Sequence, residues 1–382
     1  MYILEKSTTF AAEMNKELLY KVLEDWYEMN HRILPWRETD DPYKIWISEI
    51  ILQQTRVAQG MEYYHRLVTR FPDIQSLADA EEDEVLLYWQ GLGYYSRARN
   101  LHKAAQLMKD HEIFHLSNVE CLKLKDEEIF AALKSMPGVG DYTAGAIASF
   151  AFDLPYPALD GNVYRVLSRL YDCEIAFDST EGKKHFRKLA EDLLDREHPR
   201  LFNSAIMELG ALHCVPTTPD CQTCPLNTWC KALANNTVEL LPIRKPRPKV
   251  RDRYLEYTIY ITPERTTLIH QRKGNDIWKH LWEFVETTSV DSVKNDNIDN
   301  LRGNQLPAAL QGSASELSEL LNPYKVIELT HVLSHQKLHA RFVIKNVSEL
   351  PEIPDTVVVS LSDLDNYAFS RLTLRAIEEL EL

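Results

Sequence analysis

Residues 136–144 read MPGVGDYTA and join two segments whose apolar residues recur at helical spacing. The first helix is predicted to end near Leu133 and the second to begin near Tyr142, with Gly138 and Gly140 in a tight turn between them. Such a turn exposes backbone N–H groups at the start of a helix, which can bind an anion such as a phosphate without a charged side chain. A glycine turn between helices is more often only a turn, so this hairpin indicates a binding site only together with other features.

The first half of the chain is predicted to be helical. Apolar residues recur at helical spacing from about residue 14 to 212, and no stretch there favours a strand. Acidic residues that suit helix N-caps precede several segments, namely Asp41, Asp73, Asp126 and Asp160. We therefore expect residues 1–241 to form an all-α domain.

A basic, proline-rich stretch separates this half from the rest. Residues 242–253 read PIRKPRPKVRDR, a composition that favours an extended linker. Residues 254–382 are predicted to form an α+β domain. Its predicted strands cover residues 254–261, 267–271, 326–330 and 338–344, and a closing helix covers 370–380. Residues 287–312, rich in Asp, Asn and Ser, are predicted to form a loop or an insertion.

Composition narrows the class of protein. A chain of 382 residues is long enough for two domains. The formal net charge of -14 argues against a protein that coats nucleic acid indiscriminately, but it leaves room for a local basic face. No apolar run approaches the roughly 20 residues of a membrane span, and the N-terminal residues lack the pattern of a secretory signal. We expect a cytosolic protein with no membrane association, whose six cysteines are thiols or metal ligands.

Four of the six cysteines are closely spaced and indicate a metal site. They follow the pattern C-x6-C-x2-C-x5-C and are Cys214, Cys221, Cys224 and Cys230. A structural zinc site usually shows two C-x2-C pairs and this loop has one, so an iron–sulfur centre fits better than zinc or four unligated thiols. The other two, Cys121 and Cys173, lie in predicted helical stretches and are expected to be buried core residues.

Two carboxylates stand where the helical pattern does not require an acid. Glu49 interrupts the apolar run of residues 46–52, where burial would raise its pKa and make it a general acid near neutral pH. A salt bridge or a solvated position would be the alternative. Asp160 follows two prolines and begins a helix, so it is either a helix cap or a catalytic group. Hydrolysis of a glycosidic bond can use two such carboxyl groups, one as acid and one to stabilise the sugar cation.

Several motifs occur in one order along the chain: LPWR at 34–37, SEIILQQT at 48–55, GLGYYSR at 91–97, the hairpin, DGNV at 160–163 and the four-cysteine loop. Together they resemble the adenine DNA glycosylases of the MutY family over nearly the whole chain. That resemblance implies an all-helical helix-hairpin-helix domain, a C-terminal domain similar to Nudix hydrolases, and a four-iron four-sulfur cluster on the four cysteines.

The resemblance also implies roles for single residues. Glu49 would protonate adenine, and Asp160 would stabilise the sugar cation or bond to it transiently. The other implied site residues are Glu208 near the adenine, Gln54 and Tyr94 inserted into the DNA stack, and Arg37 and Asn162 in the active site. By residue type alone, Gln53 and Tyr95 are also suitable wedges or amide donors beside the candidate acid. Taken alone, Glu208 could be a charge on a helix surface, Tyr94 a core aromatic and Arg37 part of a surface ion pair.

The related endonuclease III branch shares this fold, hairpin and cluster. Its members use a hairpin lysine as a Schiff-base nucleophile and so also cut the DNA strand. The matching position here is Tyr142, and a phenol cannot form that imine. The sequence therefore favours simple hydrolysis, which leaves the strand intact.

In the second domain, WEF at 282–284 resembles the Nudix-like part of these glycosylases. The stretch after it lacks the Arg-Glu and Glu-Glu pairs that would hold magnesium in a pyrophosphohydrolase, so this domain is expected to recognise rather than catalyse. In the family, a Phe-Ser-His loop contacts 8-oxoguanine, and its counterpart here is Leu333-Ser334-His335. Leucine in the first position removes any stacking by an aromatic ring. A simple turn at a strand end is the alternative for these three residues.

We therefore expect a monomeric DNA repair glycosylase that works in the bacterial cytosol or nucleoid. It would bind double-stranded DNA, flip an adenine paired with 8-oxoguanine or guanine, and leave an abasic site. Two other classes remain open: a non-catalytic protein that binds DNA lesions or senses redox state, and a nucleotide pyrophosphohydrolase. The intact Glu49 and Asp160 argue against the first, and the absent magnesium ligands argue against the second.

Overall fold

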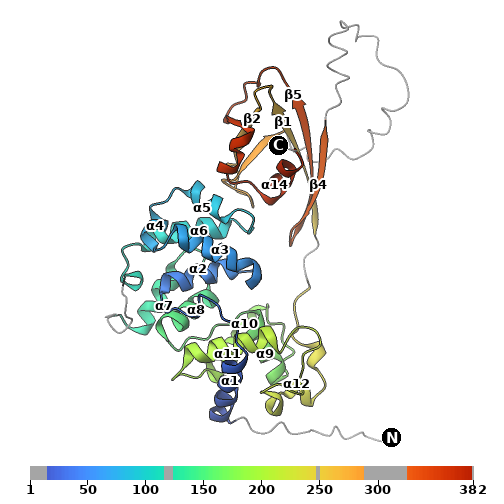
Figure 1. Cartoon of the computed structure of the whole chain (residues 1–382). Coiled ribbons are helices and arrows are strands. Elements are labelled where there is room, and N and C mark those ends of the chain that lie inside the picture. The colour runs from blue at the N-terminus through green and yellow to red at the C-terminus, as the bar shows by residue number, and fades with distance from the viewer. Residues whose placement is uncertain (1–14, 116–123, 247–249, 288–324, 381–382) are drawn as a thin grey trace, which may run out of the picture. The chain divides into compact units, whose positions relative to one another are not determined.

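A computed structural model of the chain describes residues 15–115, 124–246, 250–287 and 325–380. The chain divides into two compact units (Figure 1). The helical unit comprises Met1–Ala80 and Arg97–Arg247, and the sheet unit comprises Glu81–Ser96 and Pro248–Leu382. A helical domain followed by a mixed β-sheet domain confirms the predicted fold class.

Helices make up the regular structure of the helical unit. They are α1 (Lys16–Asn30), α2 (Pro42–Leu52), α3 (Val57–Arg70), α4 (Ile74–Ala78), α6 (Ser96–Met108), α7 (Asp126–Ser135), α8 (Asp141–Phe152), α9 (Gly161–Tyr171), α10 (Thr180–Leu193), α11 (Pro199–Leu212) and α12 (Lys231–Ala234). No strand lies among the described residues of this unit, as its apolar spacing predicts.

Three of the four predicted acidic caps are observed. Asp41 accepts hydrogen bonds from the backbone of α2, Asp73 from that of α4, and Asp160 from that of α9. Asp126 is instead the first residue inside α7, and Lys125 occupies the cap position. An acid in the first helical turn still interacts favourably with the helix dipole, which explains why its sequence position resembles a cap.

The hairpin has the predicted form. Helix α7 ends at Ser135 and α8 begins at Asp141, with Gly140 as its N-cap. Gly138 has a φ of +81°, the left-handed region that favours glycine, and a Cβ atom added there would lie 3.0 Å from the Cβ atom of Asn100. Glycine at this position therefore allows both the turn and its close packing.

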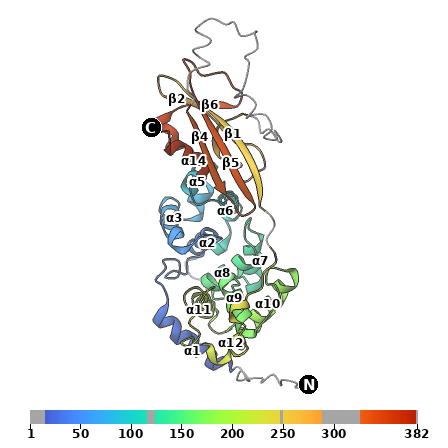
Figure 2. The same cartoon turned by 90° about the vertical axis from the view of Figure 1, so that its right-hand side faces the viewer.

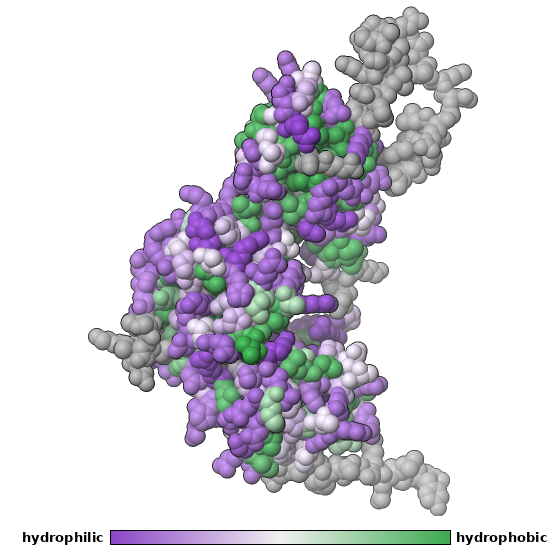
Figure 3. Space-filling model, in the orientation of Figure 1, coloured by the Kyte–Doolittle hydropathy of each residue, from purple (hydrophilic) through white to green (hydrophobic). Residues whose placement is uncertain are grey.

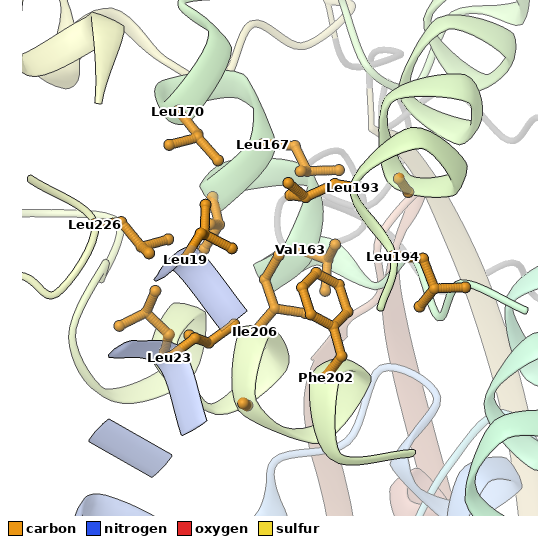
Figure 4. Packing of buried hydrophobic residues seen from close by; sticks show 14 of the residues in the cluster. Leu19, Leu23, Val163, Leu167, Leu170, Leu193, Leu194, Phe202, Ile206 and Leu226 are labelled. Carbon is orange, nitrogen blue, oxygen red and sulfur yellow. The ribbon is translucent and has the colours of Figure 1, made fainter. Parts of the chain in front are cut away.

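One hydrophobic cluster holds the lower helices of this unit together (Figure 4). Leu19 and Leu23 of α1 pack against Leu167 of α9, Phe202 of α11 and Leu193 of α10. All five side chains are buried. Because residues from both ends of this unit's sequence meet here, the cluster fixes α9 and α11 relative to α1.

The sheet unit contains α5 (Glu82–Trp89), a six-stranded sheet and α14 (Arg371–Glu378). The strands are β1 (Arg251–Ile261), β2 (Thr266–Gln271), β3 (Trp282–Glu286), β4 (Val326–Val332), β5 (Gln336–Asn346) and β6 (Thr356–Ser360). Their order is β4-β5-β1-β3-β2-β6, as Figure 2 helps to follow. Only the β1–β5 pair is parallel, so the sheet is mixed.

Some sequence predictions for this region need correction. The linker was expected to extend to residue 253, but Arg251–Arg253 already belong to β1 and pair with residues 336–338. Tertiary pairing overrides the basic composition there. Strands β3 and β6 are not among the predicted strands; both form by pairing with β2.

Other predictions concern cysteines, loops and membranes. Cys173 is buried as expected, but it lies after the end of α9 rather than within a helix. Cys121 and residues 288–312 of the expected loop lie outside the described residues.

No helix in the described part of the chain has the length and apolar character to cross a membrane. In the view of Figure 3, hydrophobic side chains reach the surface only in small groups among hydrophilic ones.

The core cluster predicts a sharp difference between two neighbouring residues of α1. Leu19 is fully buried, whereas Leu18 is 51% exposed. We expect Leu19→Ala to lower the free energy of unfolding by about 2–5 kcal/mol, because it removes buried methyl groups and leaves a cavity. The control Leu18→Ala should change it by less than about 0.5 kcal/mol. Denaturant unfolding followed by circular dichroism measures both, and equal losses would contradict the packing described.

Candidate active site

A cavity of about 650 Å³ opens in the helical unit between α2, the hairpin, and the adjoining parts of α9 and α11. This volume is typical of a ligand site. Ten of the predicted site residues line it: Arg37, Glu49, Gln53, Gln54, Gly138, Gly140, Tyr142, Asp160, Asn162 and Glu208. The structure thus brings together residues that are up to 171 positions apart in sequence, from Arg37 to Glu208.

Glu49 is the most deeply buried acid of the cavity, with 1% of its surface exposed. Its Oε2 atom accepts a 2.7 Å hydrogen bond from the hydroxyl of Tyr142. Its Oε1 atom lies 3.7 Å from Nη1 of Arg37 and has no hydrogen-bond partner among the described residues. One carboxyl oxygen is therefore held by a hydrogen bond, and the other is buried beside Arg37 without one.

The surroundings of Glu49 determine its protonation. Burial raises the pKa of this carboxyl, and the nearby charge of Asp160 adds to the rise. The Arg37 guanidinium and the Tyr142 hydroxyl lower the pKa of Glu49, without cancelling the effect of burial. Burial also raises the pKa of Tyr142 well above its usual value, so Tyr142 remains a protonated donor. A carboxyl in this setting can keep its proton at higher pH than one in water, as a general acid requires.

Asp160 is both a helix cap and a wall of the cavity. Its Oδ1 atom accepts from the backbone of Asn162 at 2.9 Å and of Val163 at 2.8 Å. Its Oδ2 atom accepts from the side-chain amide of Asn162 at 2.7 Å. Burial raises the pKa of Asp160, whereas these three hydrogen bonds favour its charged form. Capping and a catalytic role are therefore compatible at this residue.

Arg165 connects this acid to the cysteine loop. Its Nη2 atom donates to Oδ1 of Asn162 at 2.9 Å and its Nε atom to the carbonyl of Cys214 at 2.7 Å. At Gly210 of α11, an added Cβ atom would lie 2.7 Å from the Cβ atom of Asn162, so only glycine allows this packing. Neither Arg165 nor Gly210 was predicted from the sequence, because their partners lie about 45 residues away.

Glu208 is buried rather than on a helix surface, and it is paired. Its two carboxylate oxygens accept from the Arg32 guanidinium at 2.6 and 2.8 Å and from the Arg32 backbone at 3.0 Å. Sequence reasoning missed Arg32, which lies 176 residues from its partner. Arg32 lines the same cavity, so Glu208 would meet a ligand with its orientation already fixed.

Gln54 is exposed at the mouth of the cavity, beyond the end of α2, and its φ is +59°. A non-glycine residue in this region of backbone space is unusual and often marks a functional position. Arg97, also missed from the sequence, is buried and donates to the carbonyls of Ile51 at 2.8 Å and Gln53 at 2.5 Å. It therefore supports the turn that carries Gln54.

The remaining predicted site residues belong to the sheet unit. Tyr94 is 48% exposed with a φ of +50°, and its hydroxyl lies 2.8 Å from that of Ser334. Tyr95, suggested as a wedge beside it, is instead buried and donates to the carbonyl of Phe369, so that suggestion is wrong. Ser334 and His335 are exposed in the turn between β4 and β5, which Leu333 closes by donating to the carbonyl of Gln336.

The four clustered cysteines lie between the end of α11 and the start of α12 and line one small cavity. Arg169 stands against it, with Nη1 3.3 Å from the sulfur of Cys214. Burial raises the pKa of Cys224 to about 12 and also raises that of Cys230. A bound metal centre would favour the thiolate forms. Among the described residues, no three His, Cys, Asp or Glu side chains stand close enough to hold a single metal ion.

Two stretches of the chain match known protein families. Residues 47–195 match the model of the HhH-GPD superfamily base excision DNA repair protein, and residues 256–379 match that of the NUDIX domain. A solved thermostable thymine-DNA glycosylase is similar with a TM-score of 0.48 and 23% identity, covering 58% of this chain and 97% of that one.

Curated relatives match over more of the sequence. An adenine DNA glycosylase of Buchnera aphidicola subsp. Baizongia pistaciae is 33% identical over 320 residues, which cover 82% of this chain and 87% of that protein. The adenine DNA glycosylase of Mus musculus is 41% identical over 215 residues, covering 54% of this chain and 40% of that protein. The chain therefore belongs to the adenine DNA glycosylase family of base excision repair enzymes.

Proposed function

We propose that the chain flips an adenine paired with 8-oxoguanine or guanine out of duplex DNA and hydrolyses its bond to the sugar, leaving an unbroken strand with an abasic site. The observation that carries this proposal is the buried Glu49, whose Oε2 atom is held by Tyr142 and whose Oε1 atom has no hydrogen-bond partner among the described residues. That free oxygen suits delivery of a proton to a base bound in the cavity.

In the proposed reaction, Glu49 protonates the five-membered ring of adenine while the bond between that ring and the sugar breaks. The electron pair of the bond leaves with the base, and positive charge develops on the sugar. Asp160, whose carboxyl oxygens accept three hydrogen bonds that favour its charged form against the effect of burial, lines the same cavity and would stabilise that charge. Water then adds its oxygen to the sugar and releases a proton, which restores Glu49.

Strand cleavage is not expected, because the cavity offers no amine for a Schiff base. The hairpin position of the endonuclease III lysine is Tyr142, a phenol committed to Glu49. No lysine is found among the described residues that line the cavity.

The first test uses Glu49→Gln on a duplex with adenine opposite 8-oxoguanine. We expect wild-type protein to give strand breaks only after hot alkali, and the variant to bind the duplex but to release base about 100 to 10,000-fold more slowly. Single-turnover excision and a binding titration measure both, with exposed Glu239→Gln as a control. Excision within tenfold of wild type would show that Glu49 is not the acid, and breaks before alkali would disprove simple hydrolysis.

We also propose that the four clustered cysteines hold a four-iron four-sulfur cluster. The support is that four thiols from one short loop line a common cavity against α9, beside Arg169. A cluster bound there would cross-link a loop that has little regular structure of its own. Arg165 and Arg169 would hold that loop to the helix that begins at Asp160.

Metal analysis separates this proposal from a zinc site. Protein purified without oxygen should contain about four iron atoms per chain and be brown. Cys224→Ser should lose iron, while Cys173→Ser, at a buried cysteine outside the loop, should retain it. One zinc and no iron in the wild-type protein would overturn the assignment.

The turn between β4 and β5 is proposed to recognise the 8-oxoguanine. Its support is the exposure of Ser334 and His335 and the 2.8 Å contact between the hydroxyls of Ser334 and Tyr94, which is itself exposed. Tyr94 and Ser334 thus present two hydroxyl groups together. With leucine at position 333, recognition would depend on polar contacts rather than on stacking.

Replacing both Ser334 and His335 with alanine should reduce excision of adenine opposite 8-oxoguanine far more than excision opposite guanine. Each lost base contact is expected to cost about 1–3 kcal/mol, or roughly 5 to 150-fold. Single-turnover rates on the two duplexes provide the comparison, and the guanine duplex is the internal control. An equal decline on both duplexes would mean that this turn does not read the lesion.

A further inference from the structure

A second cavity adjoins the active site on the other side of the hairpin. It has a volume of about 340 Å³ and shares Gly140, Tyr142 and Leu159 with the large cavity. Its other walls come from α7, the loop before α9, α9 itself and α10. We call it the tyrosine cavity, because Tyr142, Tyr156 and Tyr164 all line it.

The side chains of the tyrosine cavity offer hydrogen-bond donors without partners. The hydroxyls of Tyr156 and Tyr164 make no hydrogen bond to any described residue, and the ammonium of Lys183 makes neither a hydrogen bond nor a salt bridge there. The rings are fixed in place, since Tyr156 stacks on Phe130 with centroids 4.1 Å apart and Tyr164 stacks on Phe177 at 5.0 Å. Donors held in fixed positions suit an anionic ligand.

Among the described residues that line this cavity, one is an acid, Asp141, and it is paired with cations. Asp141, the first residue of α8, pairs with Lys134, and its Oδ1 atom also lies 3.8 Å from Nη1 of Arg187. These cations lower the pKa of Asp141 below its usual range. Lys183 lines the cavity without a salt bridge to any described residue, so its positive charge is available to a ligand there.

The position of the cavity identifies the anion. The hairpin presents backbone N–H groups at the start of α8, which suit a phosphate of the DNA strand that carries the target adenine. Phosphates follow one another along a strand, so a strand bound at the hairpin would carry a neighbouring phosphate into the adjoining space. We propose that the tyrosine cavity is a second phosphate subsite for that strand, with Lys183 supplying charge and Tyr156 and Tyr164 supplying hydrogen bonds. This inference rests on the proposed DNA substrate.

The test measures binding to a duplex with a tetrahydrofuran abasic analogue opposite guanine, over a series of salt concentrations. Lys183→Ala should lower the slope of log affinity against log salt by about 0.9, the value for one lost phosphate contact. Lys184→Ala is the matched control, because it removes the same charge from the next, exposed position of α10, outside the cavity. Lys183→Arg should restore the wild-type slope, which separates a charge effect from misfolding.

Two further arms identify the ligand. Tyr156→Phe and Tyr164→Phe should each weaken binding at least about tenfold, as expected for a lost hydrogen bond to a charged group, without changing the salt slope. Single phosphates replaced by neutral methylphosphonates should reveal one position that weakens wild-type binding but does not weaken Lys183→Ala further.

Equal salt slopes for Lys183→Ala and Lys184→Ala would overturn the proposal. So would a methylphosphonate series in which no position weakens wild-type binding selectively. So would Lys183-dependent binding of inorganic phosphate with unchanged DNA binding, which would make the cavity a site for free phosphate. The analogue duplex contains no mispaired adenine, so the binding measurements do not depend on excision. Failure of the wild-type protein to release adenine would disprove the proposed function but would not change the binding result.

Discussion

The burial of one carboxyl group, that of Glu49, is the constraint on which the site depends. Helix α2 is buried along almost its whole length, so it can carry an acid only where neighbouring elements supply partners. The hairpin supplies Tyr142, and the segment before α2 supplies Arg37. These partners satisfy one oxygen and leave the other without a hydrogen bond. An acid with hydrogen bonds to both oxygens would be more stable and less reactive. The incomplete hydrogen bonding of Glu49 therefore favours its proposed role in proton transfer.

Helix α9 borders three different parts of the helical unit. Its cap, Asp160, faces the large cavity, and Tyr164, one turn later, lines the tyrosine cavity. Arg165 and Arg169, four residues apart and so on one face, hold the backbone of the cysteine loop. A displacement of the cysteine loop would therefore act on α9 and on the orientation of Asp160. The cysteine loop is thus connected to Asp160 through α9.

Sequence reasoning succeeded where local chemistry and periodicity carry the information. The helical half, the hairpin glycines and the buried Glu49 follow from spacing and residue type alone. The sequence did not reveal the roles of Arg32 and Arg97, whose partners are distant along the chain. Sequence alone does not show whether an arginine is solvated or buried. It also failed for the five-residue strands β3 and β6, which exist through pairing with neighbours rather than through their own pattern.

An acidic protein that binds DNA must supply positive potential locally. Here many cations are already paired, as Arg32 is with Glu208 and Lys134 with Asp141, and those pairs give little attraction to a phosphate. At the hairpin and the tyrosine cavity, a phosphate would instead meet neutral donors, namely backbone N–H groups and phenol hydroxyls, together with the cation of Lys183. Neutral donors bind phosphate only at short range and in one geometry. A site that depends on them should discriminate by shape more than by charge over the whole surface, as the proposed removal of one mispaired adenine among many normal pairs would require.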